Sequence, residues 1–248
     1  MILNKDVDLL KHLNKELRKY KVKLCFKYYP TCPFSDHQLE IMELIIKYAD
    51  CFDSYHHRIF ILSSLCDEHF KDSVPYLVKT YHYFLSEVYS VPKDEMYLLF
   101  LCDTIAKINA LEYIDLYESI ISRPMTQSAE SIIMMLSKMN VDKVDDMIFD
   151  LIKKENLIPK AWFGELNEDS KYWCSLVALK CIVNKKKDKY LAFFNELVQD
   201  KDMAWIKFVE SKYKSTLTLE MKKKYKVLAE KGIKQIQSAT KRQSLQFS

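Results

Sequence analysis

The spacing of apolar side chains predicts helices along almost the whole chain. Leu9, Leu10, Leu13 and Leu17 recur three and four residues apart, a spacing that places them on one face of a helix. Ser35 and Gln38 have the spacing of a capping box, which marks the start of another helix. Predicted helices cover the following ranges: 6–20, 35–48, 55–69, 74–89, 92–109, 111–122, 126–140, 142–155, 169–184, 188–200, 203–213 and 219–237. The sequence therefore predicts an all-α protein.

The predicted helices come in pairs that repeat along the chain. Leu65-Cys66-Asp67 matches Leu101-Cys102-Asp103 at an offset of thirty-six residues, and another set of positions matches at an offset of thirty-one. Each unit has a helix that ends in Asn or Lys, a very short turn, and a second helix that ends in two aliphatic residues. A period of about thirty to forty residues with two helices per unit is typical of an α-solenoid.

This organisation resembles the HEAT-like family of helical repeats over residues 55–200. The resemblance implies an α-solenoid, a superhelix of stacked antiparallel helix pairs, without an invariant catalytic residue. We expect a single repeat domain over residues 1–237 and a flexible tail at 238–248. The expected parts of the domain are N-terminal capping helices at 1–54, repeats at 55–213 and a C-terminal capping helix at 214–237.

Glycine is almost absent from the chain, which holds only Gly164 and Gly232. Phosphate-binding loops, dinucleotide-binding turns and tight hairpins need glycine for a positive φ or for close backbone approach. The G-x-S-x-G and H-E-x-x-H motifs are also absent from the sequence. These observations argue against a nucleotide-binding enzyme, and we expect no cofactor.

The start of the chain and its cysteines indicate a cytoplasmic protein that contacts no membrane. Charges recur within the first six residues, so they lack the apolar core of a signal peptide. No apolar run approaches the roughly 18 residues that a membrane span requires. The seven cysteines are odd in number and mostly occupy apolar helix faces, which suits buried thiols in a reducing compartment.

The titratable residues show no pattern typical of a metal or catalytic site. All six histidines lie in the first third of the chain, but no pair has the ligand spacing of a zinc site. Asp145 and Asp146 are adjacent, so on a helix they point in different directions and form no general acid–base pair. We predict no metal ion and no catalytic residue. An enzyme with an unrecognised helical active site is the least favoured hypothesis.

Four acidic residues of the predicted second helices recur in register. They are Asp115, Asp146, Asp150 and Glu196. Second helices usually line the concave surface of a solenoid of this kind, so these acids predict a negative stripe that holds a basic protein or peptide. The same acids are explained equally well as ordinary residues on the solvent-exposed faces of amphipathic helices. The favoured function is a non-catalytic protein-binding scaffold, adaptor or inhibitor-type protein.

An aromatic segment interrupts the repeats at residues 158–164. It places Trp162 and Phe163 beside Gly164, and Trp173 follows on the next predicted helix. These side chains form either an anchor for a partner or a plug that fills the gap between two repeats. The plug is the favoured interpretation, because buried aromatic residues usually serve packing.

Charge is distributed unevenly, although the formal net charge is only +4. Residues 1–30 carry eight Lys or Arg against three acids, and residues 201–248 carry twelve against four, so the middle is acidic. The basic end, which includes Arg242, favours contact with nucleic acid, and some HEAT-like proteins are DNA-repair glycosylases. Arginine is scarce, however, and an acidic groove repels phosphates. Nucleic-acid binding or DNA repair is therefore the alternative to protein binding, and a solvated lysine-rich cap is the simpler explanation of this end.

Overall fold

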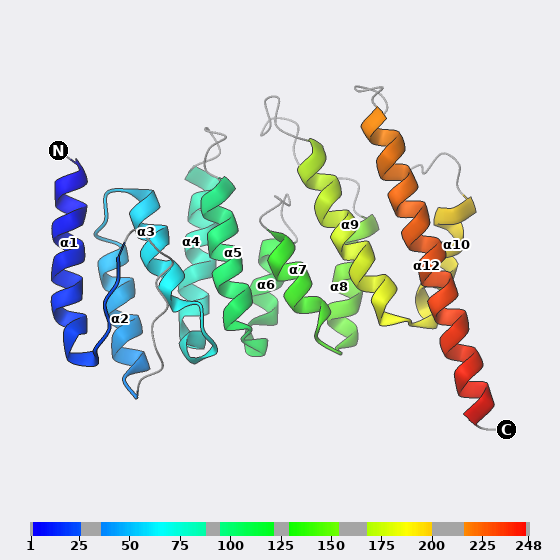
Figure 1. Cartoon of the computed structure of the whole chain (residues 1–248), viewed down its shortest axis with the longest axis horizontal. Helices are drawn as coiled ribbons and strands as arrows, with labels where there is room; N and C mark the ends of the chain where they lie inside the picture. The colour runs from blue at the N-terminus through cyan, green and yellow to red at the C-terminus, as the bar shows by residue number, and fades with distance from the viewer. Residues whose placement is uncertain are drawn as a thin grey trace. The chain divides into compact units, whose positions relative to one another are not determined.

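The chain is helical throughout the part that its structure describes. The computed structural model describes residues 2–25, 36–87, 95–121, 129–153, 168–199 and 216–246. These residues form eleven α-helices joined by short connections and 3-10 turns, and they include no β-strand. The prediction of an all-α protein is confirmed (Figure 1).

The observed helices follow the predicted ranges closely at most positions. The α-helices are α1 (Ile2–Leu17), α2 (Gln38–Ala49), α3 (Tyr55–Leu62), α4 (Val74–Glu87), α5 (Glu95–Ile108), α6 (Ile114–Ile121), α7 (Glu130–Ser137), α8 (Asp142–Lys153), α9 (Glu168–Lys185), α10 (Leu191–Gln199) and α12 (Thr216–Gln246). Single 3-10 segments extend some of them: η1 (Arg18–Tyr20), η2 (Ser63–Leu65), η3 (Glu68–Ser73), η5 (Leu111–Tyr113) and η7 (Asp188–Tyr190). The predicted helix at 203–213 lies outside the described residues.

The described residues fall into two compact units. Unit 1 lies within Met1–Met135, and unit 2 consists of Leu136–Leu157 and Asn167–Ser248. The boundary falls inside α7. The expectation of one continuous repeat domain stays a prediction.

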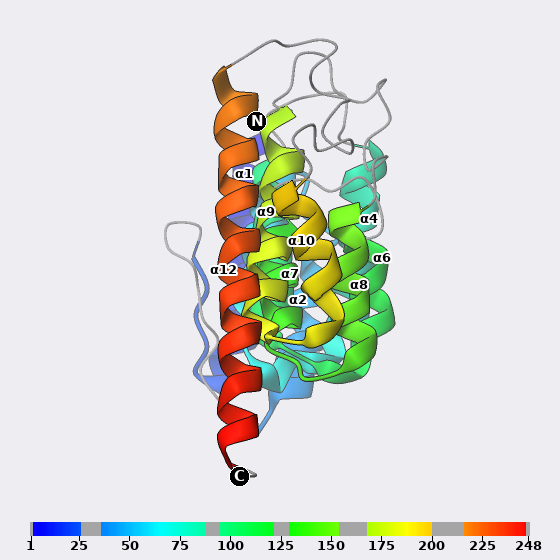
Figure 2. The same cartoon turned by 90° about the vertical axis from the view of Figure 1, so that its right-hand side faces the viewer.

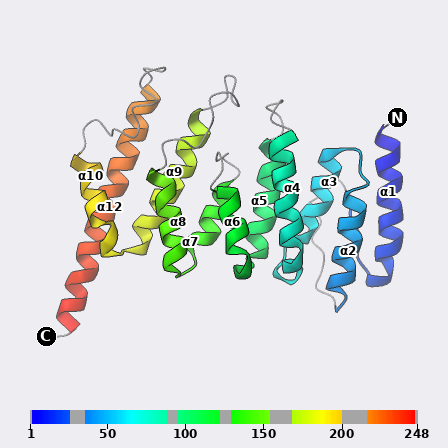
Figure 3. The ribbon, with the colours of Figure 1, turned by 180° about the vertical axis from the view of Figure 1, so that it is seen from behind.

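Unit 1 buries the apolar faces of neighbouring helices. Helix α1 packs against α2, α2 against α3, α3 against α5, and α4 against both α5 and α6 (Figures 1 and 3). Large side chains that are completely buried fill the spaces between them: Leu13, Leu17, Ile41, Ile45, Phe84 and Tyr117. Burial of such side chains stabilises each by about 1.5–3 kcal/mol relative to exposure.

A buried carboxylate joins α1 to the start of α3. Asp6 is fully buried and accepts hydrogen bonds from the backbone N–H of Asp53 at 3.0 Å and of Ser54 at 3.1 Å. Its Oδ2 also lies 2.7 Å from Nδ1 of His57. Burial alone would raise the pKa of Asp6, but the hydrogen bonds from His57 and the backbone outweigh burial and lower it. Asp6 therefore links the two helices, and both oxygens of its buried carboxylate have hydrogen-bond partners.

Unit 2 is organised around α12. This helix packs against both α9 and α10, and Figure 2 shows its last turns extending past them. Its buried face includes Tyr225, Ala229 and Ile236, at helical spacing. Gly232 lies on the same face, where a Cβ atom would come within 2.6 Å of the ring of Phe194 in α10. The absence of a side chain at this residue sets how closely α10 and α12 approach.

Three predicted boundaries are wrong. The helix predicted over 55–69 is interrupted at Cys66 and Asp67, because the Asp67 carboxylate accepts from the backbone N–H of His69 and starts a new segment. Helix α2 begins at Gln38 after His37, so Gln38 does not hold the third helical position that a capping box requires. Helix α12 continues to Gln246, so most of the predicted tail at 238–248 is helical.

Helix ends in this chain adopt the left-handed conformation without glycine. Lys21, Asn109 and Lys186 have φ values of 62°, 53° and 54°. Glycine usually occupies such positions because a side chain there costs roughly 1–2 kcal/mol. These residues show how a glycine-poor chain ends its helices.

In the described residues, no helix is both long enough and apolar enough to cross a membrane.

Candidate functional site

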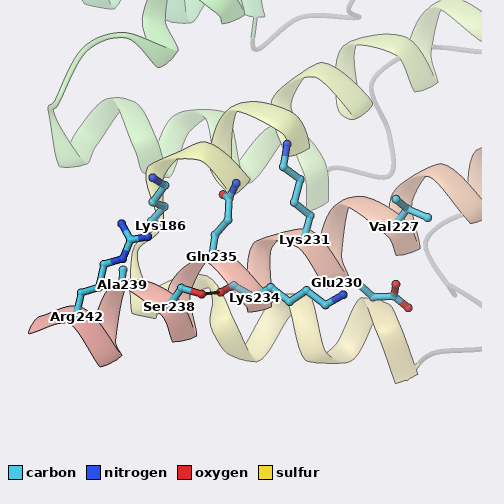
Figure 4. A pocket seen from close by; sticks show the side chains of 9 residues that line it. All are labelled: Lys186, Val227, Glu230, Lys231, Lys234, Gln235, Ser238, Ala239 and Arg242. Carbon is cyan, nitrogen blue, oxygen red and sulfur yellow. Dashed lines mark hydrogen bonds between the residues drawn. The ribbon is translucent and has the colours of Figure 1, made fainter. Parts of the chain in front are cut away.

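A basic groove runs along one side of α12, where the helix passes the end of α9. It is open, with a volume of about 540 Å³. Its lining comes from α12 and from the residue that follows α9: Lys186, Val227, Glu230, Lys231, Lys234, Gln235, Ser238, Ala239 and Arg242. We call this feature the α12 groove (Figure 4).

Helical spacing brings the α12 side chains of the groove onto one face. Lys231, Lys234, Ser238 and Arg242 are separated by three or four residues in turn, so they follow each other along the helix. Lys186 reaches the groove because its left-handed backbone turns the chain sharply after α9. Figure 4 shows Arg242 beside Lys186 at one end of the groove.

The α12 groove concentrates positive charge. It contains four cationic side chains and one acid, Glu230. Among the described residues, no carboxylate forms an ion pair with the cations at 186, 231, 234 or 242. Their charges are therefore available to a negatively charged ligand.

Neutral polar groups complete the lining. The Ser238 hydroxyl donates to the backbone oxygen of Lys234 at 2.7 Å. The amide oxygen of Gln235 is buried and accepts no hydrogen bond from the part of the protein that the structure describes. Within the described residues, the side-chain carbonyl of Gln235 is therefore unsatisfied.

Elsewhere in unit 2, lysines and acids neutralise each other. Lys187 lies 2.7 Å from Asp142 and 2.6 Å from Asp145, and hydrogen bonds to these two carboxylates raise the pKa of Lys187. The nearly buried ammonium of Lys185 lies 2.9 Å from the carboxylate of the fully buried Asp145. We call the ion pairs between the start of α8 and the segment after α9 the α8 ladder.

The α8 ladder includes one of the residues predicted to bind a partner. Asp146 is exposed, but its carboxylate lies 2.6 Å from the ammonium of Lys189. The hydrogen bond to Asp146 raises the pKa of Lys189. An acid whose charge is neutralised within the chain contributes little to a negative surface.

The other predicted acids are exposed but lie in different units. Asp115 occupies the first turn of α6 in unit 1, whereas Asp150 in α8 and Glu196 in α10 belong to unit 2. Asp150 and Glu196 form no ion pair among the described residues. The predicted negative stripe stays a prediction.

The predicted aromatic anchor falls largely outside the described residues. Trp162 and Phe163 lie there, and the choice between an anchor and a plug stays open. Trp173 belongs to α9, but its side chain is also outside the described part.

No cluster of three or more His, Cys, Asp or Glu side chains that could hold a metal ion occurs within the described ranges. None of the described cysteines takes part in a disulfide within the described ranges, and they differ in exposure. Cys102 and Cys181 are buried, as the sequence predicts for thiols on apolar faces, whereas Cys51 is exposed.

Comparison of the chain with protein-family models, with curated proteins and with solved structures finds no significant match. The resemblance to HEAT-like repeats stays a prediction.

Proposed function

We propose that this chain is a non-catalytic binding scaffold that holds an acidic protein segment in the α12 groove. The observation that carries the proposal is the convergence of four cations on a single groove that offers only one acid. Charged surfaces of this kind accelerate encounter with an oppositely charged partner and select against partners of the same sign.

The sign of the preferred partner differs from the sequence-based expectation. That expectation placed four acids on a negative stripe: Asp115, Asp146, Asp150 and Glu196. Of these, Asp146 pairs with Lys189, and the neighbouring acids Asp142 and Asp145 pair with lysines at and after the end of α9. The acids at the start of α8 are therefore neutralised within the chain, whereas the four cations of the α12 groove have no carboxylate partner among the described residues.

The mixed lining of the groove favours protein over nucleic acid. Val227 and Ala239 add apolar surface, and Glu230 can accept hydrogen bonds from the backbone N–H groups of a peptide. Only one of the four cations is arginine, the residue that makes bidentate contacts with nucleic-acid phosphates. The residues that line the groove include no aromatic side chain on which a nucleic-acid base could stack.

We further propose that the paired helices form a HEAT-like α-solenoid. The support is the repeat register in the sequence together with the regular succession of packed helices within each unit. In such arrays, binding surfaces form from exposed faces of successive helices.

Affinity purification from native lysate tests the binding proposal. The groove variant carries Lys231→Glu and Lys234→Glu, and the matched control carries Lys223→Glu and Lys226→Glu on the same helix outside the groove. We expect the wild type and the control to retain the same proteins, rich in Asp and Glu, and the groove variant to lose them. Retention of these proteins by the groove variant would contradict the proposal. Release of the retained proteins by nuclease treatment would also contradict it.

A second candidate surface rests on the exposed acids Asp150 and Glu196. If they bind a basic partner, replacing Asp115, Asp146, Asp150 and Glu196 together by the corresponding amides should abolish retention of basic proteins and leave folding intact. Unchanged retention by this variant, with the same salt dependence, would remove the negative stripe as a binding site.

A further inference from the structure

The positive charge of the α12 groove suits a ligand group that carries more than one negative charge. A carboxylate brings one negative charge, whereas a phosphoryl group on serine or threonine brings about −1.5 to −2 and three acceptor oxygens. Clusters of arginine and lysine are the usual recognition element for phosphorylated segments. The four cations of the groove suit such a group better than they suit a carboxylate alone.

The geometry assigns a position to this group. Arg242 and Lys186 come from different elements, α12 and the residue after α9, and lie side by side in Figure 4. A guanidinium presents two parallel N–H donors to phosphoryl oxygens, and an ammonium adds a point charge that can rotate. The amide of Gln235 lies one helical turn from the hydroxyl of Ser238 on the same wall and can add a neutral donor.

The length of the groove suits an extended peptide. Lys231 and Arg242 are separated by about 16 Å along the axis of α12, at about 1.5 Å per residue. That distance matches about five extended residues. A phosphoryl group at Arg242 and Lys186 therefore leaves Lys231 and Lys234 to contact acidic residues several positions away.

We infer that the α12 groove binds a phosphoserine or phosphothreonine segment with acidic neighbours, with the phosphoryl group held between Lys186 and Arg242. The inference rests on the proposed function, because it names the chemistry of the acidic partner. It adds a regulatory consequence: phosphorylation of the partner controls its capture.

Isothermal titration of the full-length chain with three synthetic peptides tests the inference. The probes are acetyl-Glu-Glu-X-Glu-Glu-Leu-amide with phosphoserine, serine or glutamate at X. We expect the phosphoserine peptide to bind at least tenfold more tightly than the other two. We also expect Arg242→Gln and Lys186→Gln each to reduce its affinity at least fivefold, with much smaller effects on the glutamate peptide.

Control variants separate a local effect from a general loss of charge. Lys226→Gln removes the same charge from an exposed residue of α12 outside the groove, and it should leave all three affinities unchanged. Thermal unfolding of each variant should match the wild type, since the substituted side chains are exposed.

Each outcome bears on a different proposal. Equal affinity for the phosphoserine and glutamate peptides, both lost with Lys231→Glu and Lys234→Glu, would overturn the phosphoryl inference and keep the proposed function. Absence of binding by all three peptides would overturn both. Competition is a further check. If a short DNA duplex or phosphatidylserine vesicles displace the phosphopeptide at a lower concentration than the free peptide itself does, both proposals are overturned.

Discussion

Gly232 shows how one residue controls the packing of two helices. A methyl group at this position would lie 2.6 Å from the ring of Phe194, which is fully buried, so the ring or its helix must shift to admit it. Glycine costs about 1 kcal/mol relative to alanine in a helix. The close contact between α10 and α12 explains why the chain keeps one of its two glycines at this position.

We predict that Gly232→Ala destabilises the protein in spite of its better helix propensity. Overpacking costs about 1–3 kcal/mol, and the gain in propensity offsets about 1 kcal/mol of it. Urea unfolding should show a net loss of up to about 2 kcal/mol in the free energy of unfolding. In a Phe194→Leu background the same substitution should be neutral or stabilising. A stabilised Gly232→Ala single variant would show that α10 moves away without cost.

Asp6 makes stability depend on pH. Its pKa in the folded protein lies below the ordinary value, so its contribution is complete above the unfolded pKa of about 3.9. That contribution is lost as the pH falls through the folded pKa. We predict that Asp6→Asn costs about 2 kcal/mol at pH 7, where the wild-type carboxylate accepts charge-assisted hydrogen bonds.

The check is urea unfolding of the wild type and Asp6→Asn at pH 7 and pH 3. The difference between them should shrink at pH 3, because protonation removes the advantage of the carboxylate. A difference that is the same at both pH values would mean that the residue acts through shape alone.

At the scale of helices, the apolar pattern predicted most elements and the local polar residues decided their ends. Helices α4 and α5 lie within a few residues of the predicted ranges, because their buried stripes are regular. The interruption at Cys66 and Asp67 was missed, since the apolar spacing continues across it and only the side chain of Asp67 competes with the helix. The C-terminal extension of α12 was missed because its last turns are mostly polar.

The ion pairs of Asp145 and Asp146 in the α8 ladder differ greatly in burial, and we predict different costs for breaking them. Asp145 is completely buried and pairs with both Lys185 and the partly exposed Lys187, so Asp145→Ala leaves the nearly buried ammonium of Lys185 without its carboxylate and should cost about 3–5 kcal/mol. Asp146→Ala breaks an exposed pair with Lys189 and should cost less than about 1 kcal/mol. Urea unfolding of the two variants measures both values. Similar losses in the free energy of unfolding would show that the burial of Asp145 does not change the cost of breaking its ion pairs.

At the scale of the whole molecule, the sequence predicted where the positive charge lies and missed the site that it forms. Lys231, Lys234 and Arg242 belong to the basic end that the sequence makes visible. The groove also needs Lys186, which is distant in sequence and is brought there by a left-handed helix end. The neutralisation of Asp146 depends on a lysine that follows a different helix, so a one-dimensional pattern of acids did not reveal it.

Small-angle X-ray scattering tests the proposed solenoid. A compact globule of this length has a radius of gyration of about 18 Å. We predict a clearly larger value and a pair-distance distribution with a long tail, because stacked helix pairs extend in one direction. A radius close to about 18 Å would rule out an extended array.

The left-handed backbone at Lys186 has an evolutionary consequence. Three helix ends bear the conformational cost of a side chain where glycine would fit, so single substitutions to glycine offer inexpensive gains in stability at Lys21 and Asn109. At Lys186 the same exchange would remove an ammonium group that lines the α12 groove. At Lys186, therefore, the proposed binding role and the stability of the fold favour different residues.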